Sequence, residues 1–571
     1  MNMNRPWLSH YPAGVAHDVQ PEQYRSLATL LEESLRKNAR QPVSVCMERW
    51  MSYGELDQHS AALGAWLQAK GLAPGARVAI MLPNVPQFLV AMAAVVRAGY
   101  TVVNVNPLYT ARELEHQLKD SGAEAIVILE NFAHTLEEVI DVTRLRHVVV
   151  ASLGDLLGFW YGRWISFAVR HLAKLVPAYK LPVTGVLGPR TIASFRQALA
   201  EGTSQTLKPS LAQADDIAFL QYTGGTTGRP KGAMLSHRNM VANLEQTIAW
   251  IGSTLKEREE TIITALPLYH VFALTANFLV FVKLGGRNVL ITNPRDVPGL
   301  IREMKSHRFT VITGVNTLFK ALLDENAFDA VRAANAGALK LAIAGGMAVQ
   351  RAVAERWQQA MGVPLLEGYG LTEASPNVCV NRFDAREFTG KLGLPLPSTE
   401  LAILDERGAE LALGEVGEIC VRGPQVMHGY WNAPEETANA FTPQGWLRTG
   451  DLGRMDPRGY VEFVERRKDV IVVSGFKAYP TEIEEVVMRH PGVKDAGAVG
   501  IPDPRSGEAV ALFVVKKDPA LTAGALREHC AKHLARYKQP RRIEFRDALP
   551  KSPIGKVLHR ELKASASAAR A

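Results

Sequence analysis

A regular alternation of short apolar runs with helical patterns is the feature that most constrains the fold. Four apolar runs, each of four or five residues, occur at 77–81, 101–105, 125–129 and 147–150. Helical patterns at 87–97 and 111–119 lie between them. Buried parallel strands joined by crossover helices have this rhythm, so the segment predicts βαβ units.

The same rhythm resumes after a less regular insertion. Strands are predicted at 217–221, 288–291, 309–313, 340–343 and 364–367, with helices between them. Past Gly414 the strand candidates lie closer together, at 417–422 and 460–463, which indicates a smaller β-rich subdomain over about 395–467. The predicted fold class is therefore α/β, with a large N-terminal domain of layered α/β subdomains and this β-rich subdomain.

A second domain is predicted after the charged stretch 465–469, which interrupts two β-type runs. Beyond it the chain shows helix, strand, strand, helix and strand patterns in turn. We predict domains at 1–467 and 468–571, the second being a small α+β lid joined through a hinge. The Ala/Ser-rich tail, 564–571, is expected to fray.

Bulk composition narrows the function classes. The 571 residues exceed what one hydrophobic core usually serves, so more than one domain is expected. The four cysteines include no C-x-x-C pair, so neither a disulfide framework nor a cysteine zinc site is indicated. The net charge is +8, but no basic run with interleaved aromatics accompanies a nucleic-acid module, so no nucleic-acid partner is expected. Without a secretory pattern or an apolar run of about 18 residues, we expect a cytoplasmic protein.

A loop dense in glycine and threonine follows the strand predicted at 217–221. Its signature residues are Tyr222, Thr223, Gly224, Gly225, Thr226, Thr227, Gly228 and Lys231. Closely spaced backbone N–H groups and hydroxyls suit phosphate oxygens, and the lysine adds a point charge. Pro230 and Gly232 stand where a Walker A motif needs Gly and Ser or Thr, so a P-loop ATPase or kinase is disfavoured. A plain Gly/Thr turn is the alternative to a phosphate site.

The loop resembles the signature of the acyl-adenylate-forming superfamily, which holds acyl-CoA synthetases, luciferases and nonribosomal peptide adenylation domains. Further motifs agree in order along the chain, at 367–373, 446–451 and 550–556, and the resemblance extends from about Trp7 to Leu562. Segments 104–109, 112–118 and 266–272 also resemble those of bacterial long-chain fatty acid–CoA ligases. The resemblance implies ATP and coenzyme A as cosubstrates and Mg²⁺ as a cofactor.

Motif 367–373 is expected to complete the ATP site. It carries an aromatic ring, a hydroxyl and a carboxylate within five positions, at Tyr369, Thr372 and Glu373. These groups suit stacking on adenine, contact with phosphate and binding of Mg²⁺, a hard cation that prefers oxygen ligands. The resemblance pairs Glu373 with Thr223 on the metal. A turn with a solvated glutamate is the alternative.

Two pairs of residues are assigned to the adenosine part of ATP. Gly345 and Gly346 end a predicted strand, where the lack of side chains lets the backbone approach a flat adenine ring. The two carboxylate oxygens of Asp451 can accept hydrogen bonds from both ribose hydroxyls, and the resemblance assigns this role to Asp451 and also brings Arg466 to the ribose. Without the surrounding motifs, each of these residues would be interpreted as a common turn or hinge residue with no role in binding.

The resemblance names Lys556 as the catalytic lysine, placed between the substrate carboxylate and the α-phosphate. It moves His270 to the acyl pocket; a structural histidine is the alternative. Lys556, His270 and Thr372, whose hydroxyl is expected to contact phosphate, form the predicted catalytic set. Residues 272–282 carry no charge and are predicted either to line an apolar tunnel or to form a buried core helix. After adenylation, the lid is expected to rotate about Lys468 and Asp469 for thioester formation.

A helical pattern within 156–181 raises the question of membrane contact. At about 100° per residue, Arg163, Arg170 and Lys174 fall on one side, opposite an arc of Tyr161, Trp164, Ile165, Ala168, Val169, Leu172, Leu175 and Val176. Trp160 and Phe167 lie beside the basic face. Such a helix can lie among lipid headgroups. The resemblance to ligases that act at the inner membrane implies peripheral contact with its cytoplasmic face. Docking on the domain is the alternative.

The sequence therefore predicts a long-chain fatty acid–CoA ligase, and the resemblance implies a role in fatty acid degradation. An aryl-CoA ligase or a fatty acyl-AMP ligase stays open within the superfamily. An acyl-binding protein without catalysis is the rival from another class, and the joint presence of Lys231, Glu373, Asp451 and Lys556 argues against it. The sequence leaves open whether the chain forms a homodimer.

Overall fold

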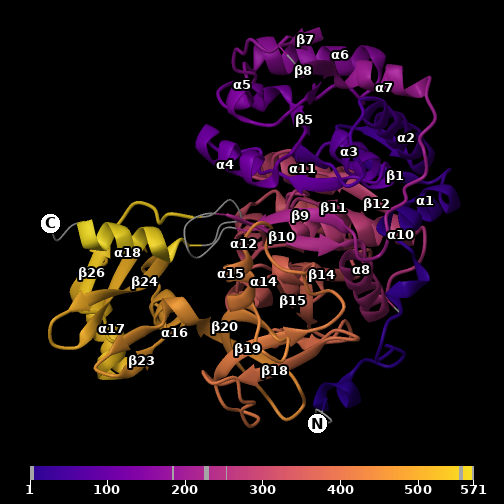
Figure 1. Cartoon of the computed structure of the whole chain (residues 1–571). Coiled ribbons are helices and arrows are strands. Elements are labelled where there is room, and N and C mark those ends of the chain that lie inside the picture. Colours follow the sequence, from indigo (N-terminus) through magenta and orange to yellow (C-terminus); the bar gives the residue numbers. More distant parts are fainter. Residues whose placement is uncertain are drawn as a thin grey trace. The chain divides into compact units, whose positions relative to one another are not determined.

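The computed structural model of the protein describes residues 5–182, 185–188, 190–223, 230–252, 254–551 and 557–568. The chain forms two compact units (Figure 1). The N-terminal unit comprises 8–400 and 422–445, and the C-terminal unit comprises 1–7, 401–421 and 446–571. Because this division groups the four-stranded sheet with the last hundred or so residues, the domain boundary at residue 467 stays a prediction.

A nine-stranded sheet forms one layer of the N-terminal unit. Its order is β17 (Leu394–Pro395), β16 (Asn377–Val380), β15 (Leu365–Gly370), β14 (Leu341–Gly345), β13 (Val311–Gly314), β11 (Thr261–Thr264), β12 (Arg287–Leu290), β1 (Pro42–Cys46) and β2 (Arg49–Ser52). The strands from β15 to β1 are parallel, whereas β16, β17 and β2 add antiparallel edges. The sheet is therefore parallel only in its centre.

An eight-stranded sheet forms the second layer. Its order is β10 (Lys231–Ser236), β9 (Ile217–Thr223), β4 (Thr101–Asn104), β3 (Arg77–Met81), β5 (Ala125–Leu129), β6 (His147–Ala151), β8 (Arg190–Ser194) and β7 (Gly185–Leu187). Only β10 and β7, at the two edges, are antiparallel to their neighbours. Strands β5 and β6 are buried at every position, which explains why the sequence shows continuous apolar runs rather than alternation.

Helices cover these sheets and separate them. They are α1 (Leu27–Lys37), α2 (Tyr53–Ala69), α3 (Pro86–Arg97), α4 (Ala111–Ser121), α5 (Ala133–Glu137), α6 (Phe159–Phe167), α7 (Phe195–Thr203), α8 (His237–Ile251), α9 (Val271–Ala273), α10 (Val280–Leu284), α11 (Val297–Ser306), α12 (Asn316–Asp324), α13 (Phe328–Ala334), α14 (Arg351–Met361) and α15 (Pro434–Ala440). Helix α3 is buried along its whole length and lies beside α2 (Figure 1). It belongs to the interior of the unit.

Local sequence signals explain where several of these helices begin and end. Thr110 caps α4 by accepting a hydrogen bond from the Glu113 amide, and the Glu113 carboxylate accepts one from the Thr110 amide in return. Gly122 ends the same helix with a φ of 60°, which a residue with a side chain rarely adopts. The bounds of α4 are thus encoded in its own sequence.

Side-chain hydrogen bonds tie the two sheets together where their strands end. Asn84, which follows β3, donates to the carbonyl oxygens of Thr264 and Leu266, both at 2.9 Å. Gln221, in β9, donates to the carbonyl oxygen of Tyr269 at 2.8 Å. The carboxyl ends of strands from both sheets therefore meet, and in α/β proteins ligands bind at such ends.

The C-terminal unit contains two further sheets. A four-stranded sheet has the order β18 (Glu400–Leu404), β19 (Gly417–Arg422), β20 (Leu447–Met455) and β21 (Val461–Arg466). A five-stranded sheet has the order β23 (Phe476–Ala478), β22 (Ile471–Val473), β25 (Gly507–Lys516) and β24 (Val493–Asp503), with β26 (Arg542–Phe545) beside β25. Helices α16 (Pro480–Met488), α17 (Ala523–His533) and α18 (His559–Ala568) accompany it.

The predicted α/β class and the small α+β C-terminal region are confirmed. The expectation of a frayed tail is wrong for residues 564–568, because α18 continues to Ala568. Leu562 and Ala566 are buried on that helix, so tertiary packing stabilises a segment of poor local signal. Within the described parts of the chain, no helix combines the length and apolar character that crossing a bilayer demands.

Contact between α2 and α7 offers a test of the packing. Gly202 lies so close to α2 that a Cβ atom built on it would be 1.9 Å from the carbonyl oxygen of Ala62. We expect Gly202→Ala to lower the free energy of unfolding by about 1–3 kcal/mol, because overpacking forces the helices apart. Urea denaturation measures this change in the free energy of unfolding. Ala200→Ser, at an exposed position of the same helix, is the control and should change stability little.

Candidate active site

A hairpin of the eight-stranded sheet holds the predicted phosphate loop. In the pairing of β9 with β10, Thr223 lies opposite Lys231 and Tyr222 lies opposite Gly232. The connecting residues Gly224, Gly225, Thr226, Thr227 and Gly228 lie outside the described residues. The two predicted ligands at the base of the loop are therefore neighbours across the ladder.

Helix α4 supports this hairpin from one side. The Tyr222 hydroxyl donates to Asp120 Oδ2 at 2.5 Å, and burial together with this carboxylate raises the pKa of Tyr222 above its usual range. His116 contacts the carbonyl oxygen of Pro230, with Nε2 at 3.1 Å. The Tyr222 side chain thus points at α4, and its predicted contact with nucleotide stays a prediction.

Tyr430 links the lysine of the hairpin to the predicted metal ligand. The Lys231 ammonium lies 4.9 Å from the centre of the Tyr430 ring, and the Tyr430 hydroxyl donates to Glu373 Oε1 at 2.6 Å. Burial and Glu373 raise the pKa of Tyr430, so its hydroxyl stays protonated and donates. Lys231 and Glu373, far apart in sequence, therefore contact one side chain.

Backbone hydrogen bonds hold Tyr430 in this position. The amide of Trp431 donates to Gly232 at 2.8 Å, and the amide of Met234 donates to Gly429 at 2.9 Å. Segment 428–431 thus runs along β10 like a short extra strand. Tyr430 was not among the residues predicted from the sequence, where the only signal is an aromatic residue in a polar stretch.

A narrow cavity brings together four other predicted residues. His270, Gly345, Gly346 and Thr372 line it, together with Phe272. A Cβ on Gly345 would lie 3.1 Å from the Phe272 ring, so only glycine leaves the backbone open beside the cavity. Tyr369 precedes Thr372 at the end of β15, in the same motif. The cavity measures about 70 Å³, below the roughly 300 Å³ at which small-molecule pockets begin.

His270 is neutral in this environment. Burial lowers its pKa to about 4. Its Nδ1 accepts a hydrogen bond from the Phe272 amide at 3.3 Å, as the cap of α9, so Nε2 carries the proton. The residue is both a helix cap and a lining residue of the cavity.

The uncharged stretch 272–282 is mostly core. It forms α9, a π-helix at Leu274–Leu279 and α10, and its members between Leu274 and Val282 are buried except Ala276. Phe272 and Ala276 line the cavity. Of the two predicted alternatives, a tunnel lining and a buried core helix, the structure supports the core helix, with Phe272 and Ala276 facing the cavity.

The C-terminal unit holds the predicted ribose ligands. Asp451 in β20 lies opposite Arg466 in β21, and Arg466 Nε is 3.1 Å from Asp451 Oδ1. Asp451 is buried, so this ion pair orients its carboxylate. The two residues that the sequence analysis assigned to the ribose are therefore in contact.

The predicted hinge contacts the segment that follows the predicted catalytic lysine, Lys556. His559 contacts Asp469 Oδ2 at 3.5 Å and Glu484 Oε1 at 2.7 Å. Burial lowers the pKa of His559, but the two carboxylates outweigh it and raise the pKa to about 10. The imidazolium is therefore charged at neutral pH. Lys556 lies outside the described residues.

The structure of α6 differs from the amphipathic helix predicted within 156–181. The α-helix covers Phe159–Phe167 and continues as a π-helix at Ala168–Leu172, so it is shorter than 156–181. Arg170 forms an ion pair with the buried Glu130, while 42% of its own side chain stays exposed. Ile165, Ala168 and Val169 are half-buried, whereas Phe159, Trp160, Trp164 and Phe167 are exposed. The helix docks on the domain and leaves its aromatic rings in solvent.

Two family profiles match the sequence of this chain. The profile of the AMP-binding enzyme family matches residues 31–431, and that of the AMP-binding enzyme C-terminal domain matches 482–556. The chain belongs to the AMP-binding enzyme family. The recognition made from the loop and its companion motifs is thereby confirmed.

Relatives of this AMP-binding enzyme are similar over nearly the whole chain. A long-chain-fatty-acid–CoA ligase of Escherichia coli O157:H7 is 52% identical over 563 residues, covering 98% of each chain. A protein of the same name from Haemophilus influenzae is 44% identical over 566 residues, again covering 98% of each. The structure of ATP-bound MatB from Rhodopseudomonas palustris has a TM-score of 0.79 at 28% identity and covers 94% of this chain and 98% of that one.

Tyr430 provides a test of the assembled site. We expect Tyr430→Phe to slow acid-dependent ATP–pyrophosphate exchange about tenfold, because a hydrogen bond to a charged group contributes about 1.5–3 kcal/mol. The dependence of exchange on Mg²⁺ concentration should shift to higher concentration as well. Tyr24→Phe, on another segment of the N-terminal unit, is the control. Equal exchange in wild type and Tyr430→Phe would show that the Glu373 contact is unimportant.

Proposed function

We propose that the chain is an AMP-forming ligase that joins long-chain fatty acids to coenzyme A through an acyl-adenylate. The observation that carries the proposal is the contact of Lys231 and Glu373 with one tyrosine, in the unit that also holds the cavity of His270 and Thr372. Relatives that are 44–52% identical over nearly the full length bear the name long-chain-fatty-acid–CoA ligase. The family resemblance implies that the product feeds fatty acid degradation.

The donor set at the hairpin fits Mg²⁺. Thr223 offers a hydroxyl and Glu373 a carboxylate, both hard oxygen ligands. Tyr430 orients one carboxylate oxygen of Glu373 by its hydrogen bond. Bound there with ATP, the ion would neutralise charge on the phosphates. Lys231 supplies a further positive charge at the base of the same loop.

The cavity suits the reacting end of an acyl group. Neutral His270 places no charge beside it, and the rings of Trp250 and Phe272 make it apolar. Its small volume means that side chains must move before a long chain enters. The same small volume is the one observation that favours a smaller acid, so an aryl-CoA ligase is the second candidate.

Lys556 is proposed to stabilise charge on the substrate carboxylate and the α-phosphate in the first half-reaction, with positioning as the main source of rate. The ribose would be held by Asp451 and Arg466. Rotation about Lys468 and Asp469 would then exchange Lys556 for the face that admits the coenzyme A thiol. The ion pair of Asp469 with His559 supports this hinge, since it joins the pivot to the segment that carries Lys556.

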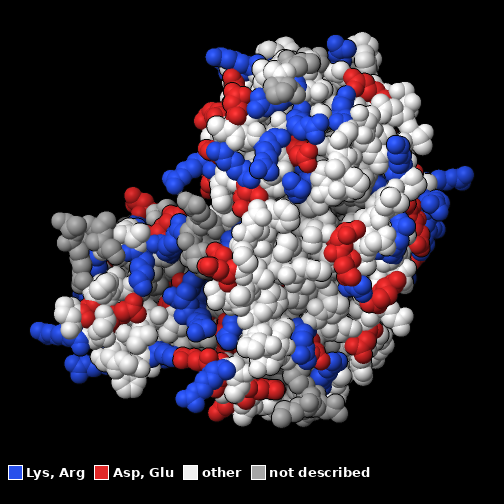
Figure 2. All heavy atoms as spheres, in the orientation of Figure 1, with Lys and Arg blue, Asp and Glu red and all other residues white. Residues whose placement is uncertain are grey.

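The exposed rings of α6 support peripheral attachment to the inner membrane at its cytoplasmic face. Trp160 is 81% exposed and Trp164 is 53% exposed, a surface that soluble proteins rarely leave uncovered. Tryptophan favours the headgroup region because its ring is apolar and its N–H is polar. Lys and Arg side chains gather on the nearby upper face, around the place where Figure 1 labels α4 and α5 (Figure 2). They suit anionic lipid.

An acid panel tests the reaction. We expect AMP release with coenzyme A present to be fastest with long-chain fatty acids and slower by at least about tenfold with short-chain and aromatic acids, because a long apolar chain contributes binding energy per methylene. Lys556→Ala should abolish acid-dependent pyrophosphate exchange and spare thioester formation from supplied acyl-adenylate.

Three outcomes separate the alternatives. Preference for aromatic acids would identify an aryl-CoA ligase. Formation of acyl-adenylate without transfer to coenzyme A would identify a fatty acyl-AMP ligase. Absence of AMP formation with every acid would revive an acyl-binding protein without catalysis. Equal loss of both half-reactions in Lys556→Ala would contradict the rotating lid.

Liposome flotation tests the membrane contact. The wild type should float with vesicles that contain anionic lipid, and the double variant Trp160→Ala/Trp164→Ala should lose most of this binding, since it removes the two exposed indoles. Trp50→Ala changes another exposed tryptophan, on β2, and is the matched control. If the double variant floats as well as the wild type, α6 is only a docked helix.

A further inference from the structure

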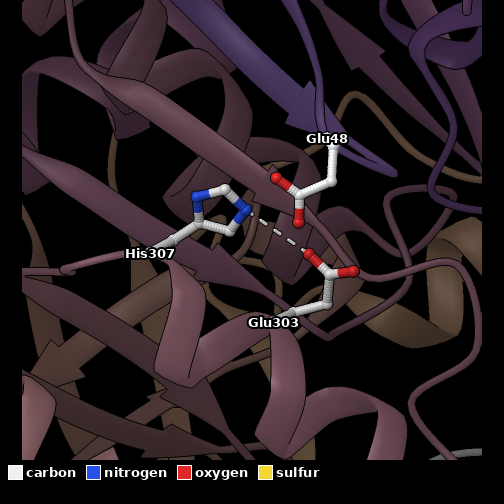
Figure 3. A group of neighbouring side chains, drawn as sticks. All are labelled: Glu48, Glu303 and His307. Carbon is white, nitrogen blue, oxygen red and sulfur yellow. Dashed lines mark ion pairs between the residues drawn. The ribbon is translucent and has the colours of Figure 1, made fainter.

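A second group of titratable side chains lies away from the candidate active site. Glu48, Glu303 and His307 point toward one another (Figure 3), and each offers one ligand atom within 4.8 Å of the other two. The candidate active site gathers around the carboxyl ends of β9, β14 and β15. His307 instead lines a cavity that includes Thr261 and Arg287, the first residues of β11 and β12. Glu48, Glu303 and His307 therefore lie near the amino ends of β11 and β12, whereas the candidate active site lies at the carboxyl ends of strands.

His307 is the member that calls for an explanation. It is 9% exposed, and its Nε2 makes no hydrogen bond within the described residues. The nearest carboxylate oxygen is Glu303 Oε2 at 3.5 Å, one helical turn back along the chain. Buried polar atoms in native proteins almost always have a close partner, so a buried nitrogen that faces two carboxylates without a hydrogen bond to them is suited to a shared metal ion.

Two elements deliver the ligand atoms, α11 with the residue that ends it and the β1–β2 turn. Glu303 lies on α11 and His307 directly follows that helix, so their spacing places both on one face. Glu48 comes from the turn between β1 and β2, where Met47 and Glu48 have φ values of 47° and 63°. Two consecutive residues at positive φ form a tight two-residue hairpin turn, which directs the Glu48 side chain to α11.

We propose that Glu48, Glu303 and His307 bind a divalent transition-metal ion of the Zn²⁺ class. One imidazole with two carboxylates is a ligand set that zinc accepts, whereas Mg²⁺ and Ca²⁺ prefer oxygen alone. Zinc bonds of about 2.0–2.2 Å need ligand atoms roughly 3.4 Å apart. The side chains of the exposed Glu48 and the half-buried Glu303 can close the remaining distance by changing rotamer.

Room for a fourth ligand exists beside His307. The adjoining cavity measures about 480 Å³ and is lined by Trp50, Glu259 and Lys340 among others. Water in this polar cavity can occupy the remaining tetrahedral position. The bound ion would join the edge hairpin of the nine-stranded sheet to α11, and so would stabilise the N-terminal unit.

Metal titration of the nucleotide-free full-length chain tests the proposal. We expect the wild type to bind one Zn²⁺ at this group in calorimetry, and bound Co²⁺ to show the visible absorption of a four-coordinate site. Affinity should fall at least about tenfold in His307→Gln and in Glu303→Gln, as expected when a metal ligand is lost. Anomalous scattering from a zinc-soaked crystal should place the ion between the three side chains.

Matched variants separate this site from other metal ligands. Glu259→Gln removes a carboxylate from the same cavity without touching the group, and should bind as the wild type does. His533→Ala disrupts the His529–His533 pair of α17, whose rings lie 4.8 Å apart and which can also hold a transition metal. If His533→Ala loses the binding, or His307→Gln keeps it, the proposal is wrong.

Glu48→Gln keeps the proposal falsifiable if His307→Gln does not fold, because Glu48 is exposed on a hairpin. It too should bind Zn²⁺ at least about tenfold more weakly. Circular dichroism and thermal melting confirm folding. Added Zn²⁺ should raise the melting temperature of the wild type and leave that of Glu48→Gln unchanged. An equal rise in both would overturn the assignment.

Discussion

The site depends on one constraint, the junction of two parallel sheets at their carboxyl ends. Asn84 is buried and makes three hydrogen bonds to the backbone of the facing sheet, two as donor and one as acceptor from the Leu268 amide at 2.8 Å. Gln221 adds a fourth, and its own side chain is oriented by Asn104. Because a buried amide without partners is costly, these contacts fix the position of segment 264–270 relative to the hairpin of β9 and β10.

Electrostatics within the N-terminal unit follow from that junction. Lys231 and Glu373 have opposite charges, yet they are joined through the ring and hydroxyl of Tyr430 and not by a direct ion pair. A cation over an aromatic face keeps its charge for another ligand, and a carboxylate with one bound oxygen keeps the second. Each group therefore keeps bonding capacity for a further ligand, and the chain belongs to the AMP-binding enzyme family.

The C-terminal unit uses charge differently. Asp451 pairs with Arg466 across a β-ladder, and His559 bridges Asp469 and Glu484 as a charged imidazolium. In each contact the charged residues come from different strands, helices or loops, which packing brings together. His559 thus holds Asp469 against α16 and α18.

The sequence alone determined the α/β class, the parallel strands and the family, because buried strands and phosphate loops are encoded by neighbouring residues. Strands β3, β5 and β19 begin and end where the apolar runs predicted them. The tertiary structure alone revealed the antiparallel edges, the core character of most of 272–282, the contact of Tyr430 with Glu373 and the meeting of Glu48 with His307. Each of these depends on packing between segments distant in sequence, and no local pattern records which buried surfaces will meet.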